Sequence, residues 1–189
     1  RELFAKLNEE GLFAPEHKRP VPLLPRRIGV VTSPMGAVIH DIISTLRQRN
    51  PYFDILIYPS AVQGERCAPE VEAGIRYLSD SGKVDVIIVA RGGGSFEEIF
   101  GYSDERVVRA VYESRVPVIT AIGHEVHSPL CDYASDMRAA TPTQAAELVL
   151  GQYDVMYAEI EGRREIMELS LRAYLDGQKR RIDYLKNHK

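Results

Sequence analysis

The stretch DVIIVARGGGS, residues 85–95, constrains the fold of this chain more than any other feature. Its five consecutive apolar residues, 86–90, predict a strand buried on both faces, as in a parallel sheet covered by helices. An arginine and three consecutive glycines follow directly, so backbone N–H groups at the strand end can approach an anion closely. The alternative is a glycine-rich turn formed for steric reasons alone. The candidate phosphate contacts are Arg91, Gly92, Gly93, Gly94 and Ser95.

Strand and helix patterns alternate on both sides of this stretch. Short apolar runs predict strands at residues 28–32, 53–58 and 116–122, and amphipathic segments predict helices between them. Ser33 and Pro34 suit a helix cap followed by proline in the first turn. This alternation is typical of an α/β fold, and we expect a mainly parallel sheet of at least four strands flanked by helices.

The two ends of the chain have a different character. Residues 1–26 predict a helix and a proline-rich linker, and residues 142–189 predict one long helix that resembles the start of a coiled-coil arm. The α/β catalytic domain is expected between them, at residues 27–141. The end of the long helix, near Lys179, is basic, which is expected of a solvated helix C-terminus. A nucleic-acid-binding site is the less favoured interpretation.

Composition limits the location and the mode of binding. Apolar residues make up 44% of the chain, but no apolar run is long enough for a membrane helix or a signal peptide. The two cysteines are far apart in sequence, which predicts reduced thiols and a cytoplasmic protein. A net charge of −3 is not typical of a nucleic-acid-binding protein. Any affinity for nucleic acid must therefore come from a local site or from segments outside this chain.

The exit loops of all four predicted strands are expected to share one crevice, because the carboxyl ends of parallel strands lie on the same edge of a sheet. Ser33 and Gln63 lie in two of these loops and are candidate phosphate contacts. His124 follows the last strand and suits proton transfer or phosphate binding, since imidazole titrates near neutral pH. Asp41 is predicted one or two turns into the first helix after that edge and could face the crevice, whereas His40 beside it is expected to be solvated.

The sequence patterns do not identify a set of metal ligands. His124 and His127 lack the spacing with which zinc peptidases bind their metal on a helix. Asp132 and Asp136 could bind a hard cation through oxygen, but helix capping or pairing with Arg138 is the safer interpretation. No nucleotide-binding P-loop motif is present.

Several motifs in order carry a resemblance to a known family: IGVVTSPMGAVIHDI, VQG, DVIIVARGGGSFEEI, VPVITAIGHE and RAATPTQAAEL. Together they resemble the large subunit of exodeoxyribonuclease VII, over residues 10–150. The resemblance implies a nuclease that degrades single-stranded DNA to oligonucleotides and works with many copies of a small helical subunit. It implies catalytic roles for Asp41, Arg91 and His124. The family's DNA-binding OB-fold and most of its helical arm are expected to lie outside this chain.

One position departs from the family pattern. After Gly-His-Glu the family usually has Thr-Asp, and that aspartate belongs to its catalytic set, but this chain has Val126 and His127. An imidazole in place of a carboxylate removes an anionic ligand or base. No cofactor is certain, and Mg²⁺ is the cation that the resemblance suggests. Either another acid such as Asp132 substitutes, or the activity is weakened or altered.

Two other functions stay open at this point. A catalytically degenerate subunit would bind single-stranded DNA or support assembly without cleaving it. A nucleotide- or sugar-phosphate-binding enzyme would use the same phosphate pocket, but the chain has no acidic ribose contact of the usual kind and ends in a helical arm.

Overall fold

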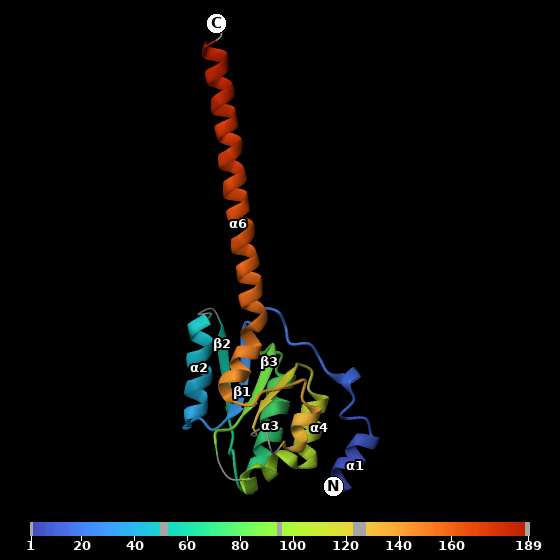
Figure 1. Ribbon diagram of the computed structural model, residues 1–189. Helices are drawn as coiled ribbons and strands as arrows, with labels where there is room; N and C mark the ends of the chain where they lie inside the picture. Colours follow the sequence, from blue (N-terminus) through green and yellow to red (C-terminus); the bar gives the residue numbers. More distant parts are fainter. Residues whose placement is uncertain (1, 50–52, 94–95, 123–127, 188–189) are drawn as a thin grey trace. The chain divides into compact units, whose positions relative to one another are not determined.

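A five-stranded sheet forms the centre of the fold in the computed structural model, which describes residues 2–49, 53–93, 96–122 and 128–187 (Figure 1). Its strands run in the order β2-β1-β3-β4-β5, and every pair of neighbours is parallel. The α/β prediction of a parallel sheet is therefore confirmed. The strands are β1 (Arg27–Thr32), β2 (Asp54–Pro59), β3 (Val86–Ala90), β4 (Val118–Ala121) and β5 (Met137–Arg138).

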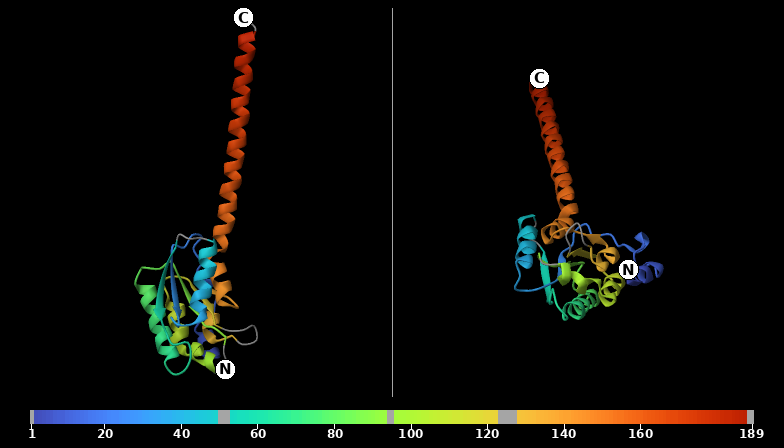
Figure 2. Two further views of the ribbon diagram at one scale, coloured as in Figure 1. Left: turned by 90° about the vertical axis from the view of Figure 1, so that its left-hand side faces the viewer. Right: turned by 60° about the horizontal axis from the view of Figure 1, so that its bottom comes forward.

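Helices cover both faces of the sheet (Figure 2). The helix α2 (Ala37–Arg49) and the first turns of α6 (Pro142–Asn187) pack on one face through residues such as Ile42 and Val149. The opposite face packs against α1 (Glu2–Glu9), α3 (Cys67–Asp80), α4 (Glu105–Glu113) and α5 (Leu130–Ala134). All five residues of β3 are buried, as an apolar strand between two helical layers should be.

One local prediction was wrong, and two short elements were not predicted. The helix α2 begins at Ala37, because Ser33–Gly36 forms a turn in which the Gly36 N–H donates to the Ser33 carbonyl at 3.5 Å. Pro34 stands at the second position of that turn, where its fixed φ is favoured. The polar stretch after β4 contains α5 and the two-residue strand β5, and the sequence pattern of that stretch predicted neither element.

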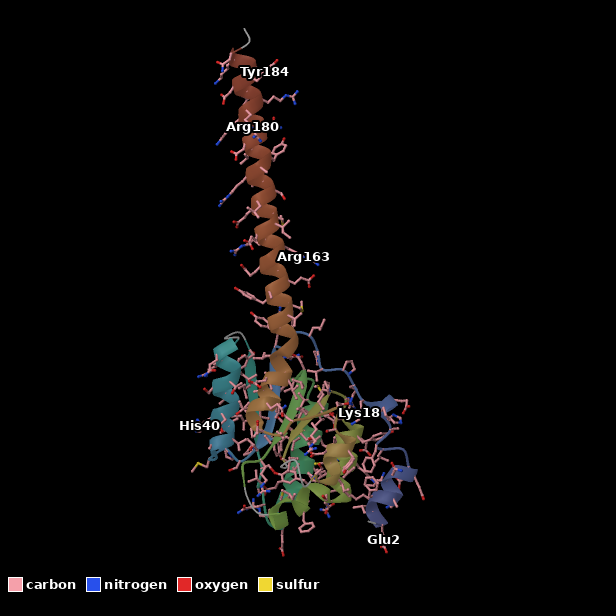
Figure 3. All side chains as sticks on the ribbon, in the orientation of Figure 1. Glu2, Lys18, His40, Arg163, Arg180 and Tyr184 are labelled. Carbon is pink, nitrogen blue, oxygen red and sulfur yellow. The ribbon has the colours of Figure 1, made fainter. Side chains whose placement is uncertain are left out.

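The segment between α1 and β1 contains a single 3₁₀ turn, η1 (Pro15–His17), and is anchored by its basic residues (Figure 3). Lys18 Nζ donates to the Ser135 carbonyl at 2.5 Å, and Arg19 Nε pairs with Asp136 Oδ1 at 3.0 Å. A second 3₁₀ segment, η2 (Phe96–Ser103), follows the glycine-rich loop and leads to α4.

Residues 152–189 form a second compact unit, which contains most of α6. Ion pairs within the helix join Arg163 to Glu159 at 2.5 Å and Arg164 to Glu168 at 3.6 Å. Many of its large apolar side chains are exposed, among them Ile160, Met167, Leu171, Tyr174, Ile182 and Leu185. Within the described ranges, no helix is both long enough and apolar enough to cross a membrane.

Candidate active site

A cleft lies at the point where the strand order reverses. From β1 the chain crosses through α2 to β2, whereas from β3 it crosses through α4 to β4 on the other side of the sheet. The loops that leave β1 and β3 therefore diverge at the carboxyl edge, and ligands of doubly wound folds bind in such a crevice. The cleft here has a volume of about 320 Å³. Its lining residues are Thr32, Ser33, Gly36, Ala37, Val38, Val62, Gln63, Arg91, Gly92 and Gly93.

Three exit loops contribute the predicted residues that meet in this cleft. Ser33 follows β1, Gln63 follows β2, and Arg91 with Gly92 and Gly93 follows β3. These residues are far apart in sequence, and the parallel sheet brings them to one edge. The four remaining predicted residues in loops, Gly94, Ser95, His124 and His127, lie outside the described residues.

Arg91 is a buried cation, with only 4% of its surface exposed. Its backbone N–H donates to the Ala121 carbonyl at 3.0 Å, which continues the pairing between β3 and β4. Burial raises the pKa of the Tyr102 hydroxyl and of the Cys67 thiol, and the nearby Arg91 charge acts in the opposite direction on both. The guanidinium thus lies close to two buried groups, Tyr102 and Cys67, and is shielded from bulk water, so its attraction for an anion is less screened than in water.

Glycine is needed in this loop for a steric reason. Among the described residues, positive φ occurs at Gly11, Gly64 and Gly82, and neither Gly92 nor Gly93 shares it, so no left-handed conformation requires glycine at these two positions. A Cβ on Gly92 would lie 3.1 Å from Val38 Cγ2. A Cβ on Gly93 would meet nothing within 4 Å. Gly92 lets β3 approach α2, whereas Gly93 borders open space in the cleft.

Thr32 is a cleft residue that the sequence interpretation did not single out. Its hydroxyl is buried and has no hydrogen-bond partner among the described residues. A buried hydroxyl without a partner is costly, and a ligand oxygen in the cleft would relieve that cost. The signal in the sequence was a polar residue that ends an otherwise apolar strand.

The loop that carries Gln63 is held by Glu70 on α3. The Ala61 N–H donates to Glu70 Oε2 at 2.7 Å, and Arg66 pairs with the same carboxylate at 2.5 Å. The hydrogen bond from Ala61 is the main reason that the pKa of Glu70 lies below its ordinary value. Gly64, at a φ of 75°, then turns the chain toward α3.

Asp41 does not line the cleft. It is exposed on α2, four residues after Ala37, so it lies about one turn farther along the side of the helix that borders the cleft. His40 points away from the sheet on the outer side of α2, as expected of a solvated residue (Figure 3).

The described residues do not form a cation site. None of the described His, Cys, Asp and Glu residues gather in groups of three or more that could hold a metal ion. Asp132 pairs with Arg138 at 3.1 Å, and Asp136 pairs with Arg19 at 3.0 Å. The predicted pairing with Arg138 is therefore confirmed for Asp132, whereas Asp136 pairs with Arg19 instead. No step of the mechanism below passes through a metal.

The fold and the cleft define a doubly wound α/β protein with a polar cleft at the carboxyl edge of the sheet. The model of the family "Exonuclease VII, large subunit" matches residues 12–189. The chain belongs to the exonuclease VII large-subunit family.

Individual relatives agree with this assignment. The chain is 46% identical to the exodeoxyribonuclease 7 large subunit of Koribacter versatilis over 187 residues, which cover 99% of this chain and 41% of that protein. It is 48% identical to the protein of the same name from Ruminiclostridium cellulolyticum over 170 residues, or 90% of this chain and 42% of that protein. The chain thus spans about two fifths of the length of these curated relatives.

Proposed function

We propose that this chain is the catalytic part of a hydrolase that cleaves phosphodiester bonds of single-stranded DNA from its ends and releases oligonucleotides. The observation that carries the proposal is the convergence of Ser33, Gln63 and Arg91 from three loops on one cleft. Membership of the exonuclease VII large-subunit family supports a DNA backbone as the source of the phosphate that this cleft would bind. Such an enzyme would act in the cytoplasm.

The proposed chemistry divides between binding and proton transfer. Arg91 and the backbone N–H groups of Gly92, Gly93 and Gly94 hold the scissile phosphate and stabilise the charge that develops on its oxygens. Ser33, Gln63 and Ser95 contact the same or a neighbouring phosphate. His124 acts as the general acid or base, and Asp41 orients it or activates the attacking water.

A second subunit is part of the proposal. The exposed apolar side chains of residues 152–189 recur at threes and fours, as in helices that pack against other helices. The relatives are named large subunits, which points to a smaller partner. We expect copies of a small helical subunit to cover this surface. Below, "the complex" means the full-length protein produced together with that subunit.

Cleavage of end-labelled DNA tests the proposed activity. The complex should shorten single-stranded DNA and leave a duplex of the same sequence intact. Mononucleotides should compete poorly with oligonucleotides for the site. Equal competition by mononucleotides would instead favour the nucleotide- or sugar-phosphate enzyme.

The degenerate alternative is favoured by one observation, His127 at the position where the family usually has aspartate. It predicts binding of single-stranded DNA without cleavage and no response of any residual activity to His124→Ala. The complex and its His127→Asp variant should be assayed with magnesium and with a chelator. A carboxylate-dependent enzyme should gain activity and magnesium response from the substitution, and equal activity in both proteins would show that the position does not matter.

A further inference from the structure

Two buried aspartates on the α5–β5 segment, Asp132 and Asp136, each pair with one arginine. Their side chains are 3% and 1% exposed. The two pairs lie at opposite edges of the sheet, and this difference suggests different roles.

The Asp136 pair closes the amino edge. Asp136 accepts hydrogen bonds from the Val118 N–H at the start of β4 and from the Arg19 N–H, both at 2.6 Å. Arg19 also donates through Nη2 to the Val111 carbonyl at 3.0 Å. These bonds tie the segment before β1 to β4 and α4, so a structural role accounts for this pair.

The Asp132 pair lies at the carboxyl edge. Arg138 pairs in register with Thr120, which is one residue before the end of β4. The Arg138 side chain is 37% exposed, so solvent and ligands reach it, and its Nε lies 3.1 Å from Asp132 Oδ2 in an ion pair that does not have hydrogen-bond geometry. A buried carboxylate beside a guanidinium favours those orientations of the planar group that keep the two charges close.

Arg138 and Arg91 lie on the same face of the sheet. Along β3, Val89 packs on the α3 side and Ala90 on the α2 side, so the alternation of a strand places Arg91 on the α3 side. Met137 and Ala139 pack on the α2 side, so Arg138 lies on the α3 side, where α5 carries Asp132.

The two arginines therefore flank the exit of β4. Their strands are separated by β4 alone, which is about 10 Å across the sheet, and the register places Arg91 two residues farther along than Arg138. Their backbones are therefore about 12 Å apart. This places two cationic forks along one edge, on the side where the proposed chemistry occurs.

We propose that Arg138 is a second phosphate-binding arginine, positioned by Asp132, that binds a backbone phosphate next to the one held by Arg91. This inference rests on the proposed function, because it takes the ligand to be a single strand of DNA. It makes Asp132 a positioning residue, and it explains why a carboxylate is kept at a buried site where an apolar residue would serve packing equally well.

The test is the salt dependence of binding of a fluorescent phosphorothioate single-stranded oligonucleotide, which resists cleavage, to the complex. Loss of one phosphate contact should reduce the slope of log affinity against log salt by about 0.7. Arg138→Gln should show this change with about tenfold weaker binding, and Arg138→Lys should keep the slope but not the full affinity. Asp132→Asn should weaken binding several-fold with the slope unchanged.

Arg19→Gln is the matched control, because it removes the arginine of the other buried pair. It should leave slope and affinity unchanged once the folded fraction is measured by thermal unfolding. An unchanged slope and affinity in folded Arg138→Gln would overturn the inference and make the pair purely structural. Failure of the unmodified complex both to bind and to cleave single-stranded DNA would instead overturn the proposed function.

Discussion

The amino and carboxyl edges of the sheet use similar charged residues in different ways. At the amino edge, Asp85 accepts from the Arg26 and Arg27 N–H groups at 2.9 Å, and Asp136 accepts from the Val118 N–H. Both carboxylates bind backbone at the start of strands. At the carboxyl edge, the cleft holds the buried Arg91 and a Thr32 hydroxyl with no partner among the described residues. Charged groups at the amino edge complete the fold, and those at the carboxyl edge line a cleft in which we propose that a ligand binds.

The largest effect is expected at Arg91. Arg91→Gln should reduce DNA cleavage by the complex by about 10²–10³-fold, because it removes the cation that stabilises charge on the phosphate. Arg27→Gln, at the amino edge, should leave cleavage per folded molecule within about twofold. Initial rates on end-labelled single-stranded DNA, normalised to the folded fraction, measure both. Equal losses in the two variants would remove the distinction between the edges.

Asp136 should matter for stability and not for cleavage. Asp136→Ala should lower the free energy of unfolding by about 3 kcal/mol, since it leaves Arg19 and the Val118 N–H without their buried acceptor. Urea unfolding measures this change. The rate of cleavage per folded molecule should not change, and a selective loss of activity would place function at the amino edge as well.

The Asp132 pair should give a stability effect that depends on pH. Burial raises the pKa of Asp132, against the opposing influence of Thr120 and Arg138. Ionisation of this carboxyl therefore opposes folding as pH rises through the interval above its ordinary pKa. Without Arg138 the pKa should rise further, so Arg138→Gln should cost little near pH 4 and about 1–3 kcal/mol near pH 7. Urea unfolding at the two pH values measures this difference, and an equal cost at both would show that Arg138 does not stabilise the ionised form.

The two glycines offer the smallest and most local comparison. Gly92→Ala places a methyl group 3.1 Å from Val38 Cγ2 and should reduce stability by about 0.5–1 kcal/mol. Gly93→Ala meets nothing and should leave stability unchanged, but its methyl group should raise the KM for DNA several-fold by occupying the cleft. Thermal unfolding and steady-state kinetics separate the two effects, and an unchanged KM in Gly93→Ala would argue against close approach of a phosphate there.

The main features of the fold could be predicted because they are local. The apolar runs and the amphipathic segments between them were sufficient for four strands and a parallel sheet. The predicted start of α2 was wrong because a turn with proline at its second position and a helix with proline in its first turn have the same sequence signal. The strand β5 was missed because two residues carry no periodicity, and it is stabilised by pairing with β4.

Residues of the candidate site that lie at strand ends could be predicted from the sequence. Contacts between residues that are distant in sequence could not. Convergence of Ser33, Gln63 and Arg91 follows from parallel topology alone. The partner of Asp136 is 117 residues away in sequence, so no spacing rule could identify Arg19. Likewise, only the packed structure shows that Gly92 is required by Val38.

The most direct test of phosphate binding at the carboxyl edge is a crystal structure of the complex with a short phosphorothioate single strand, which resists hydrolysis. Anomalous scattering from sulfur would locate the backbone. A phosphorothioate group within hydrogen-bond distance of the Arg91 guanidinium and the Gly92 and Gly93 N–H groups is the predicted result. A strand bound at the amino edge, with this cleft empty of phosphate, would contradict the account.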